Sequence, residues 1–203
     1  MIAFGEIRDL TLEHVSMVLI AVAIASLIGV TLGIWLTRRA GLRQWVLGLA
    51  GVMQTVPSLA LFGFLIPIPL IGGIGKRTAI LALVLYAILP VLRNTLTGIL
   101  GVDPAVRESA VAMGMTARQI LWEVELPLAS RTILAGIRVA TVTTIGTATI
   151  AAYIGGGGLG VLIARGLASV DSSQILAGAI PAAGIALLAE GGLEWIERKL
   201  SPA

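Results

Sequence analysis

Two glycine-containing segments of this 203-residue chain carry part of a nucleotide-phosphate loop motif. Gly155, Gly157 and Gly160 have the Gly-x-Gly-x-x-Gly spacing that lets a backbone approach a pyrophosphate. They follow no expected strand, and no acidic residue lies about twenty positions further on, as that motif requires. Gly75-Lys76-Arg77 has arginine where a P-loop needs serine or threonine. We therefore interpret both runs as turns and expect no cofactor, ATP included, to be bound by this chain.

Residue types that serve in catalysis or metal binding are scarce. Cysteine is absent and His14 is the only histidine, which excludes thiolate chemistry, cysteine zinc sites and histidine clusters. We expect no catalytic residue and no metal site. The net charge of +3 is carried by residues scattered at the ends of apolar runs, a pattern that does not indicate nucleic-acid binding.

Two apolar stretches contain small polar residues at mid-length. Pro57 interrupts the first and frees a backbone carbonyl that polar neighbours can use. In the second, threonines share one helical face at i, i+3 and i+4. Two interpretations remain open: these residues line a polar path, or their hydroxyls bond their own helix and allow close packing. The candidate path residues are Gln54, Thr55, Ser58, Thr143, Thr144 and Thr147.

One charged pair belongs to the same regions. Arg138 lies about 9 Å inside an apolar run at 1.5 Å per residue, so it can extend to the membrane interface as an anchor. A role in contacting substrate is the alternative. Glu190 lies toward the same end of another run, and a pair between the two is possible on position alone.

The composition requires that much of the surface faces lipid. Hydrophobic residues make up 57% of the chain, charged residues 12%, and the mean hydropathy is +1.01. A bilayer core needs roughly 20 apolar residues per helix. We therefore predict an all-α polytopic membrane protein, a single transmembrane domain over residues 1–200 with about five spans. The expected spans are residues 15–36, 45–71, 78–100, 132–153 and 174–194.

Basic residues predict the orientation of these spans. The loops on one side carry roughly twice as many basic residues as those on the other, and the richer side should be cytoplasmic. This places the N-terminus outside and the C-terminus inside. The first residues are net acidic, the wrong sign for a cleaved signal peptide.

The longest polar segment, residues 101–131, falls on the predicted cytoplasmic side. Asp103 and Pro104 are suited to open a helix, Gly114 to interrupt it, and Thr116 to open a second helix as part of a capping box with Gln119. We expect the second helix to end at Leu126-Pro127. Its apolar face would comprise Ile120, Leu121 and Val124, with Arg118, Glu123 and Glu125 turned away. Such a helix either lies on the membrane surface or docks into a groove of a partner.

The same segment resembles the EAA signature of ABC importer permeases. That signature reads Glu-Ala-Ala, three residues, Gly, nine residues, Ile, one residue, Leu-Pro, and the chain departs from it only at Ser109 and Val124. The resemblance implies two partner ATPase subunits that bind ATP and magnesium, a second permease subunit and an extracytoplasmic binding protein, in a bacterial plasma membrane. It implies that the ATPase-coupling residues are Glu108, Ser109, Ala110, Gly114, Thr116, Gln119, Ile120, Leu121, Val124, Leu126 and Pro127.

Four further segments are similar to permeases for osmoprotectants such as glycine betaine, choline and carnitine. They are residues 57–61, 87–94, 155–160 and 175–181. The resemblance implies a quaternary amine as cargo, and a permease for another small polar solute such as an amino acid is the alternative. An ion-coupled secondary transporter fits less well, because the acidic residues lie outside the spans or at their ends. The few aromatic residues mostly flank the spans, so an aromatic cage for the cargo would belong to the binding protein.

Overall fold

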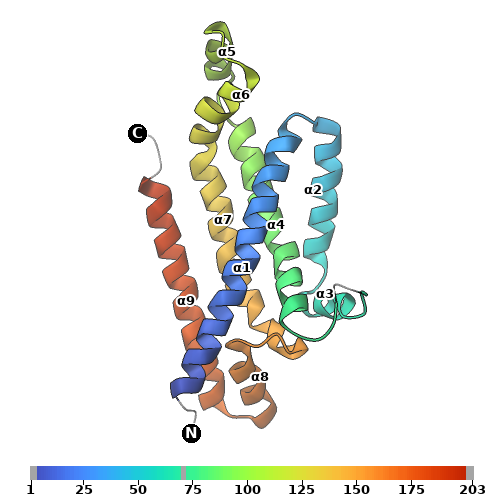
Figure 1. The fold of residues 1–203 in the computed structure, drawn as a ribbon. Helices are drawn as coiled ribbons and strands as arrows, with labels where there is room; N and C mark the ends of the chain where they lie inside the picture. Colours follow the sequence, from blue (N-terminus) through green and yellow to red (C-terminus); the bar gives the residue numbers. More distant parts are fainter. Residues whose placement is uncertain (1–3, 70–71, 200–203) are drawn as a thin grey trace.

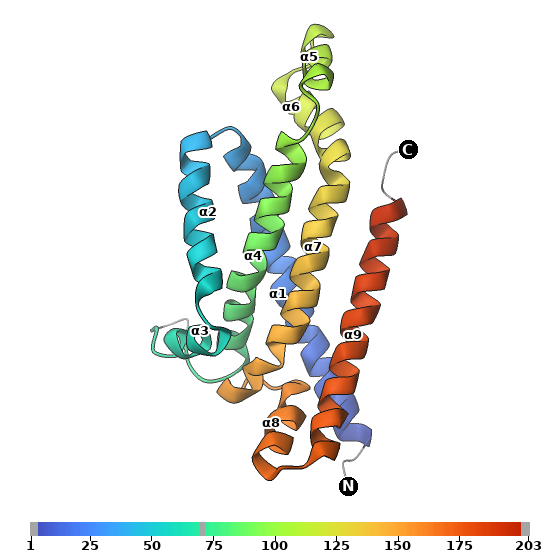
Figure 2. The ribbon, with the colours of Figure 1, turned by 180° about the vertical axis from the view of Figure 1, so that it is seen from behind.

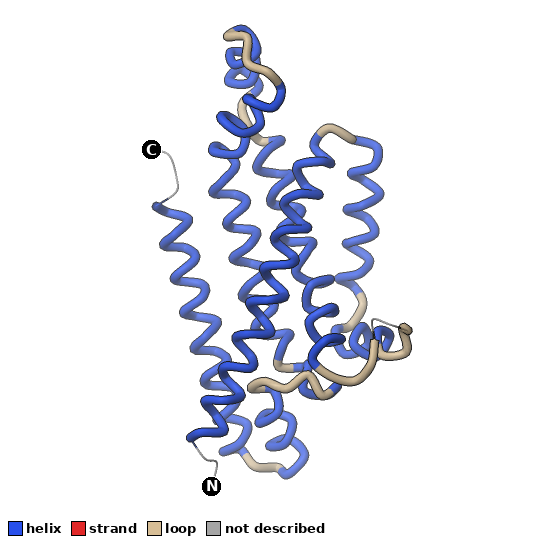
Figure 3. The backbone as a smooth tube through the Cα atoms, viewed as in Figure 1, coloured by secondary structure: helices blue, strands red, loops and turns tan. Residues whose placement is uncertain are grey.

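The computed structural model describes residues 4–69 and 72–199, which form helices and connecting loops without a strand (Figure 3). This confirms the prediction of an all-α fold. Residues 1–3 and 200 of the expected domain, and residues 70–71 of the expected second span, lie outside the described residues. The long helices are α1 (Phe4–Thr37), α2 (Ala40–Thr55), α4 (Lys76–Leu100), α7 (Leu126–Ala148) and α9 (Ser172–Lys199).

Shorter elements connect the long helices at their two ends. Four of the described helices are long and apolar enough to cross a membrane, and a bent helix pair would make a fifth crossing. The bent pair is α2 with α3. The shorter elements are α3 (Ser58–Leu65), α5 (Pro104–Ala112), α6 (Ala117–Gln119), the π-helix η1 (Ile120–Glu125), the 3₁₀ helix η2 (Ile150–Ile154) and α8 (Gly160–Ser169).

Residues 45–71 do not form the one straight helix that their hydropathy suggests. Helix α2 ends at Thr55, and α3 leaves at an angle of 102°. Val56 between them is extended, with φ −66° and ψ 127°. The cause is Pro57, which has no N–H to donate and which disfavours helical backbone in the residue before it. The break therefore places a polar kink beside α4.

Helices α1, α4 and α7 form the centre of the bundle, with α2 along α4 and α9 along α7 (Figures 1 and 2). Small residues allow these helices to approach closely. A Cβ on Gly33 of α1 would lie 2.7 Å from Thr95 of α4, and one on Gly136 of α7 would lie 2.5 Å from Asn94. The spacing between the central helices is thus fixed by glycines.

The two ends of the bundle differ. Helices α5 and α6 project at one end, whereas α3, α8 and the start of α1 lie at the other (Figure 1). Helix α9 begins at this second end and runs toward the first. Asp171 precedes it and accepts hydrogen bonds from the Gln174 side chain (3.0 Å) and the Ser173 N–H (2.9 Å), which lower the pKa of the Asp171 carboxyl. The start of α1 and the end of α9 lie toward opposite ends of the bundle (Figure 1).

Candidate functional site

The polar segment between α4 and α7 forms a projecting structure that we call the elbow, residues 103–125 (Figure 1). The side chain of Asp103 accepts a hydrogen bond of 2.8 Å from the Ala105 N–H, and Pro104 occupies the first turn of α5. Gly114 follows the end of α5 with a φ of +80°, a conformation that glycine adopts without steric cost. The predicted helix opening and glycine turn are confirmed.

The second half of the elbow begins as the sequence predicts and continues differently. Thr116 and Gln119 form the expected capping box. The predicted end at Leu126-Pro127 is wrong, because the helix passes through the π-helix η1 into α7 and stays continuous from Ala117 to Ala148. A proline normally clashes with the carbonyl four residues earlier. The wider π-turn before Pro127, closed by a bond from the Leu126 N–H to the Leu121 carbonyl, accommodates it.

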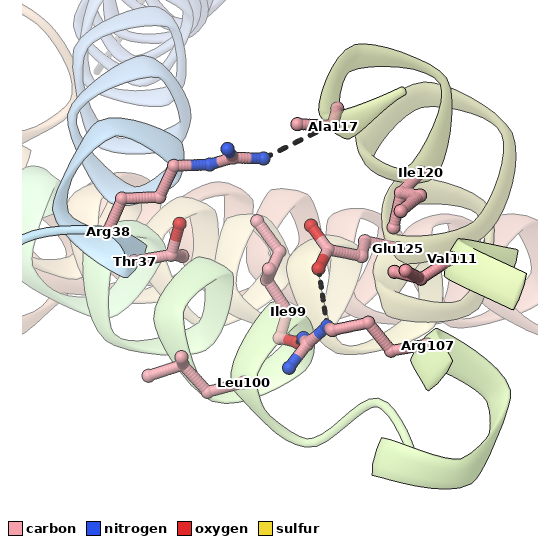
Figure 4. A pocket seen from close by; sticks show the side chains of 9 residues that line it. All are labelled: Thr37, Arg38, Ile99, Leu100, Arg107, Val111, Ala117, Ile120 and Glu125. Atoms are coloured by element: carbon pink, nitrogen blue, oxygen red, sulfur yellow. Dashed lines mark hydrogen bonds and ion pairs between the residues drawn. The ribbon is translucent and has the colours of Figure 1, made fainter. Parts of the chain in front are cut away.

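An ion pair between a half-buried arginine and a buried glutamate joins the two halves of the elbow (Figure 4). Arg107 of α5 donates from Nε to Oε1 of Glu125 at 2.7 Å, and its Nη2 donates to the Ile99 carbonyl at 3.2 Å. Glu125 is only 7% exposed. The prediction that Glu125 turns away from the buried face was therefore wrong, since the π-turn rotates it inward toward Arg107. An ion pair between residues eighteen positions apart gives no local signal in the sequence.

A second contact holds the elbow to α1. Arg38, just beyond the end of α1, donates from Nη2 to the carbonyl of Ala117, the first residue of α6, at 3.2 Å. Arg38, Arg107 and Glu125 line one cavity of about 280 Å³ between α1, α4 and the elbow (Figure 4). The start of α6 is thus tied to α1 as well as to α5.

The apolar face of the elbow points into its own chain. Ile120 is buried and Leu121 and Val124 are half-buried, so these three do not form the open face that the sequence suggested. The exposed face carries Trp122, 60% exposed. A surface hollow of about 290 Å³ opens there, lined by Thr116, Arg118, Gln119, Trp122 and Glu123. In α5, Glu108 and Ser109 are exposed and Ala110 is buried.

Gln54 from the first set of predicted path residues meets the three threonines of the second set in one cavity. Its volume is about 300 Å³, and it lies between the end of α2, the middle of α4 and α7. Thr55 and Ser58 are outside the lining, and Thr55 donates to its own helix at Val52 (2.7 Å). Tyr86 was not singled out from the sequence, because one tyrosine in an apolar run gives no signal. The lining residues are Gln54, Tyr86, Pro90, Val139, Thr143, Thr144 and Thr147.

The threonine hydroxyls in this cavity also bond their own helix. Thr143 donates to the Val139 carbonyl at 2.7 Å, Thr144 to Ala140 at 2.6 Å and Thr147 to Thr143 at 2.9 Å. The two interpretations of these threonines are therefore compatible. The hydroxyl protons satisfy the helix, while the residues still border the cavity.

Arg138 of α7 is paired with carboxylates of α9. Its Nη1 lies 2.8 Å from Oε1 of Glu190, and its Nε lies 3.3 Å from Oε2 of Glu197. Arg131, about two turns before Arg138 in α7, lies 3.6 Å from Glu197. The pair with Glu190 was one of the possibilities, whereas Glu197 was missed because it lies near the end of the chain, outside the expected span. The network joins α7 to α9.

The glycine run at 155–160 is a packed turn around a carboxylate. The Gly158 N–H donates to Oε2 of Glu13 at 3.0 Å, and a Cβ on Gly157 would lie 2.4 Å from the same oxygen. Lys76 lies 4.0 Å from the other carboxylate oxygen. A negative group already occupies the place that a phosphate would take, in agreement with the interpretation as a turn. Within the described ranges, no three His, Cys, Asp or Glu side chains gather to hold a metal ion.

Comparison with known proteins gives matches over nearly the whole chain. Residues 25–202 match the family model described as "Binding-protein-dependent transport system inner membrane component". The chain is 46% identical over 191 residues to a carnitine transport permease protein, OpuCD, of Listeria monocytogenes, covering 94% of this chain and 84% of that protein. It is 45% identical over 199 residues to a choline transport system permease protein, OpuBB, of Bacillus subtilis, covering 98% and 90%.

The fold has solved counterparts. An inward-facing MetNI methionine ABC transporter chain superposes with a TM-score of 0.87 at 20% identity, covering 97% of this chain and 96% of that one. At this identity the likeness concerns the fold alone. The family match, the two permease relatives and the shared helical architecture agree, and the chain belongs to the binding-protein-dependent inner-membrane components, the permease subunits of ABC importers.

Proposed function

We propose that this chain is the permease subunit of an ATP-driven importer for quaternary-amine osmoprotectants, with glycine betaine, choline and carnitine as candidate cargo. The observation that carries the proposal is 43–46% identity, over nearly the full chain, to permeases named for choline, carnitine and glycine betaine. The amino-acid alternative has support only from structures at 18–22% identity, which speak for the fold and not for the cargo.

In this proposal the elbow is the docking site of a partner ATPase, which binds ATP and magnesium. The support is its projection beyond the bundle and its exposed face around Trp122, with Arg118 and Glu123 beside it. A large aromatic side chain flanked by charges is the composition expected of a hot spot for a protein partner. Among the coupling residues, Glu108 and Ser109 add exposed polar groups, whereas Ile120, Leu121 and Val124 are buried or half-buried. Leu126 and Pro127 are the first residues of α7.

The proposal includes an orientation and two further partners. With the elbow in the cytoplasm, the N-terminus is outside and the C-terminus inside, in agreement with the excess of basic residues on the elbow side. A second permease subunit, identical or related, would close the cavity at Gln54 and Thr143, and an extracytoplasmic binding protein would deliver the cargo. Closure of the ATPase dimer would move the elbow and rock the bundle between outward and inward access.

The test is reconstitution of the whole transporter. The chain is placed in proteoliposomes with its partner ATPase and binding protein, and uptake of radiolabelled choline, carnitine and glycine betaine is measured with and without ATP inside. The expected result is saturable, vanadate-sensitive uptake of at least one of the three. Uptake of an amino acid in their place would overturn the proposed cargo, and uptake driven by an ion gradient without ATP would overturn the proposed mechanism.

A Trp122→Ala variant tests the docking surface separately. Trp122 is exposed and its removal leaves no cavity, so the thermal stability of the permease should be unchanged. Co-purification of the ATPase should fall about tenfold or more, since truncation of an interface hot spot costs ~2 kcal/mol or more of binding. Trp195, 58% exposed on α9, provides the matched control, and Trp195→Ala should retain the ATPase. Equal retention by both variants would contradict docking at this face.

A further inference from the structure

We propose that the cavity between α2, α4 and α7 is a transient binding site for the quaternary ammonium headgroup of the cargo, with Tyr86 as the residue that selects it. This inference rests on the proposed function and adds to it where and how the membrane subunit itself recognises its cargo. The carrying observation is a cavity of about 300 Å³ that contains several polar residues, no charged residue and almost no available hydrogen-bond donor.

The lining donates its polar hydrogens to protein carbonyls, except for the second Nε2 hydrogen of Gln54. Thr143, Thr144 and Thr147 each donate their hydroxyl proton to a carbonyl of α7. The Tyr86 hydroxyl donates to the Val56 carbonyl, and Gln54 donates from Nε2 to the Tyr86 carbonyl at 3.1 Å. What remains for a ligand is mainly oxygen lone pairs and one aromatic ring. The wall of the cavity therefore carries a negative potential without a full negative charge.

The hydroxyl and the backbone carbonyl of Tyr86 each form a hydrogen bond with a residue at the kink between α2 and α3. Its hydroxyl is bonded to the extended residue Val56, which the proline break exposes, and its backbone accepts from Gln54 at the end of α2. A ring fixed in this way loses little conformational entropy when a cation approaches its face. A cation within about 6 Å of an aromatic centroid is attracted by the ring quadrupole.

This chemistry distinguishes between classes of solute. An anion or a carboxylate needs donors, and the lining offers few. A primary ammonium has three strong N–H donors, so its strongly hydrated charge needs three well-aimed acceptors to replace the water. A quaternary ammonium donates no hydrogen bond and spreads its charge over methyl groups, so an aromatic face and a few oxygens suffice. The absence of a countercharge keeps the binding weak, as release from a transport path requires.

The experiment uses the absence of cysteine from this chain. A Thr143→Cys variant places one thiol at an exposed lining position. The complex is held in nanodiscs without the binding protein. Alkylation of the thiol by N-ethylmaleimide is followed by intact-chain mass spectrometry. Choline and its neutral carbon isostere 3,3-dimethyl-1-butanol are added as protectants. Choline should slow alkylation at millimolar concentration and the alcohol should not. A Val139→Cys variant provides a second reporter at another exposed lining position. Choline should slow its alkylation as well.

Three variants assign the effect to the ring. Added to the reporter, Tyr86→Leu should raise the choline concentration needed for protection roughly two- to fivefold, the range expected for loss of one cation–π contact. Tyr86→Phe, which keeps the ring and loses the bond to Val56, should stay closer to the parent. A thiol in place of Thr97, in the separate cavity near the elbow, should show no protection in any background.

Each outcome separates this inference from the proposed function. Equal protection by choline and the alcohol, or full protection in Tyr86→Leu, would overturn the headgroup site, because neither depends on charge at an aromatic face. If the parent transporter takes up choline and no protection is seen, the site is wrong and the proposed function stands. If it transports only an amino acid, the proposed function is wrong. The headgroup site is then supported if choline protects the reporter and overturned if it does not.

Discussion

Glu125 combines a buried position with a single cationic partner, and this makes it the residue of the elbow most sensitive to substitution. The residue is 7% exposed, and its carboxylate is balanced by Arg107 from the other half of the elbow. Removing one partner of such a pair leaves the other group without its hydrogen bond. The ion pair thus fixes the angle between α5 and η1.

Glu125→Gln should destabilise the elbow by about 1–3 kcal/mol, because Arg107 is partly exposed and water recovers some of the loss. The measurement is the midpoint of thermal unfolding of the purified permease. Glu123→Gln, an exposed carboxylate two positions away, is the matched control and should change the stability by less than about 0.5 kcal/mol. Equal midpoints for the two variants would show that the pair with Arg107 contributes nothing.

Gly114 has a φ of +80°, and a Cβ placed there meets nothing within 4 Å. Any effect of a larger residue therefore comes from the backbone alone. Gly114→Val should cost about 1–2 kcal/mol in the turn and displace α6, so that uptake falls and ATP hydrolysis no longer depends on cargo. Gly114→Asn, which tolerates this conformation, should retain more transport. Unchanged uptake and coupling in the valine variant would argue against a coupling role of the turn.

At the scale of the helices, the contact between α7 and α9 depends on charge as well as on apolar packing. Arg138 faces two carboxylates of α9 that lie two turns apart, Glu190 and Glu197. Arg131 supports only the second of these from a more exposed position. The network holds the last long helix to the bundle near the end that carries the elbow.

Arg138→Leu should leave two carboxylates without their partner and lower the stability of the permease by on the order of 3 kcal/mol. Arg131→Leu should have a much smaller effect, because its side chain is 61% exposed and its distance to Glu197 is 3.6 Å. Thermal unfolding of the purified permease measures both. Adding Glu190→Gln and Glu197→Gln to Arg138→Leu should restore most of the midpoint, and failure to do so would mean that packing and not charge is lost.

The helices and the caps could be predicted from sequence because they depend on neighbours in the chain. Asp103, Gly114 and the Thr116–Gln119 box all act within a few residues, and hydropathy identifies the apolar runs. The continuation through Pro127 could not be predicted, since it depends on a π-turn that replaces the expected break. The same turn explains the error at Glu125. Tyr86 and Glu197 needed the tertiary structure, because their partners are far away in sequence.

For the whole molecule, the proposed orientation places the start of α1 and the elbow on opposite sides of the membrane. The absence of cysteine lets single thiols report this directly. Asp9→Cys, exposed on α1, should react with a membrane-impermeant maleimide in intact cells. Arg118→Cys on the elbow and Lys199→Cys at the end of α9 should react only in inverted vesicles. The reverse pattern would overturn the orientation, and with it the docking of an ATPase at the elbow.

The unbroken helix from Ala117 to Ala148 makes the second half of the elbow and α7 a single rod. At 1.5 Å per residue, this rod is about 48 Å long. Trp122 lies near the Ala117 end of the rod, and the threonines that border the α2–α4–α7 cavity lie near the Ala148 end. If a partner ATPase docks at the elbow, as proposed, a displacement of α6 would pass along this continuous helix to the cavity without crossing a flexible linker.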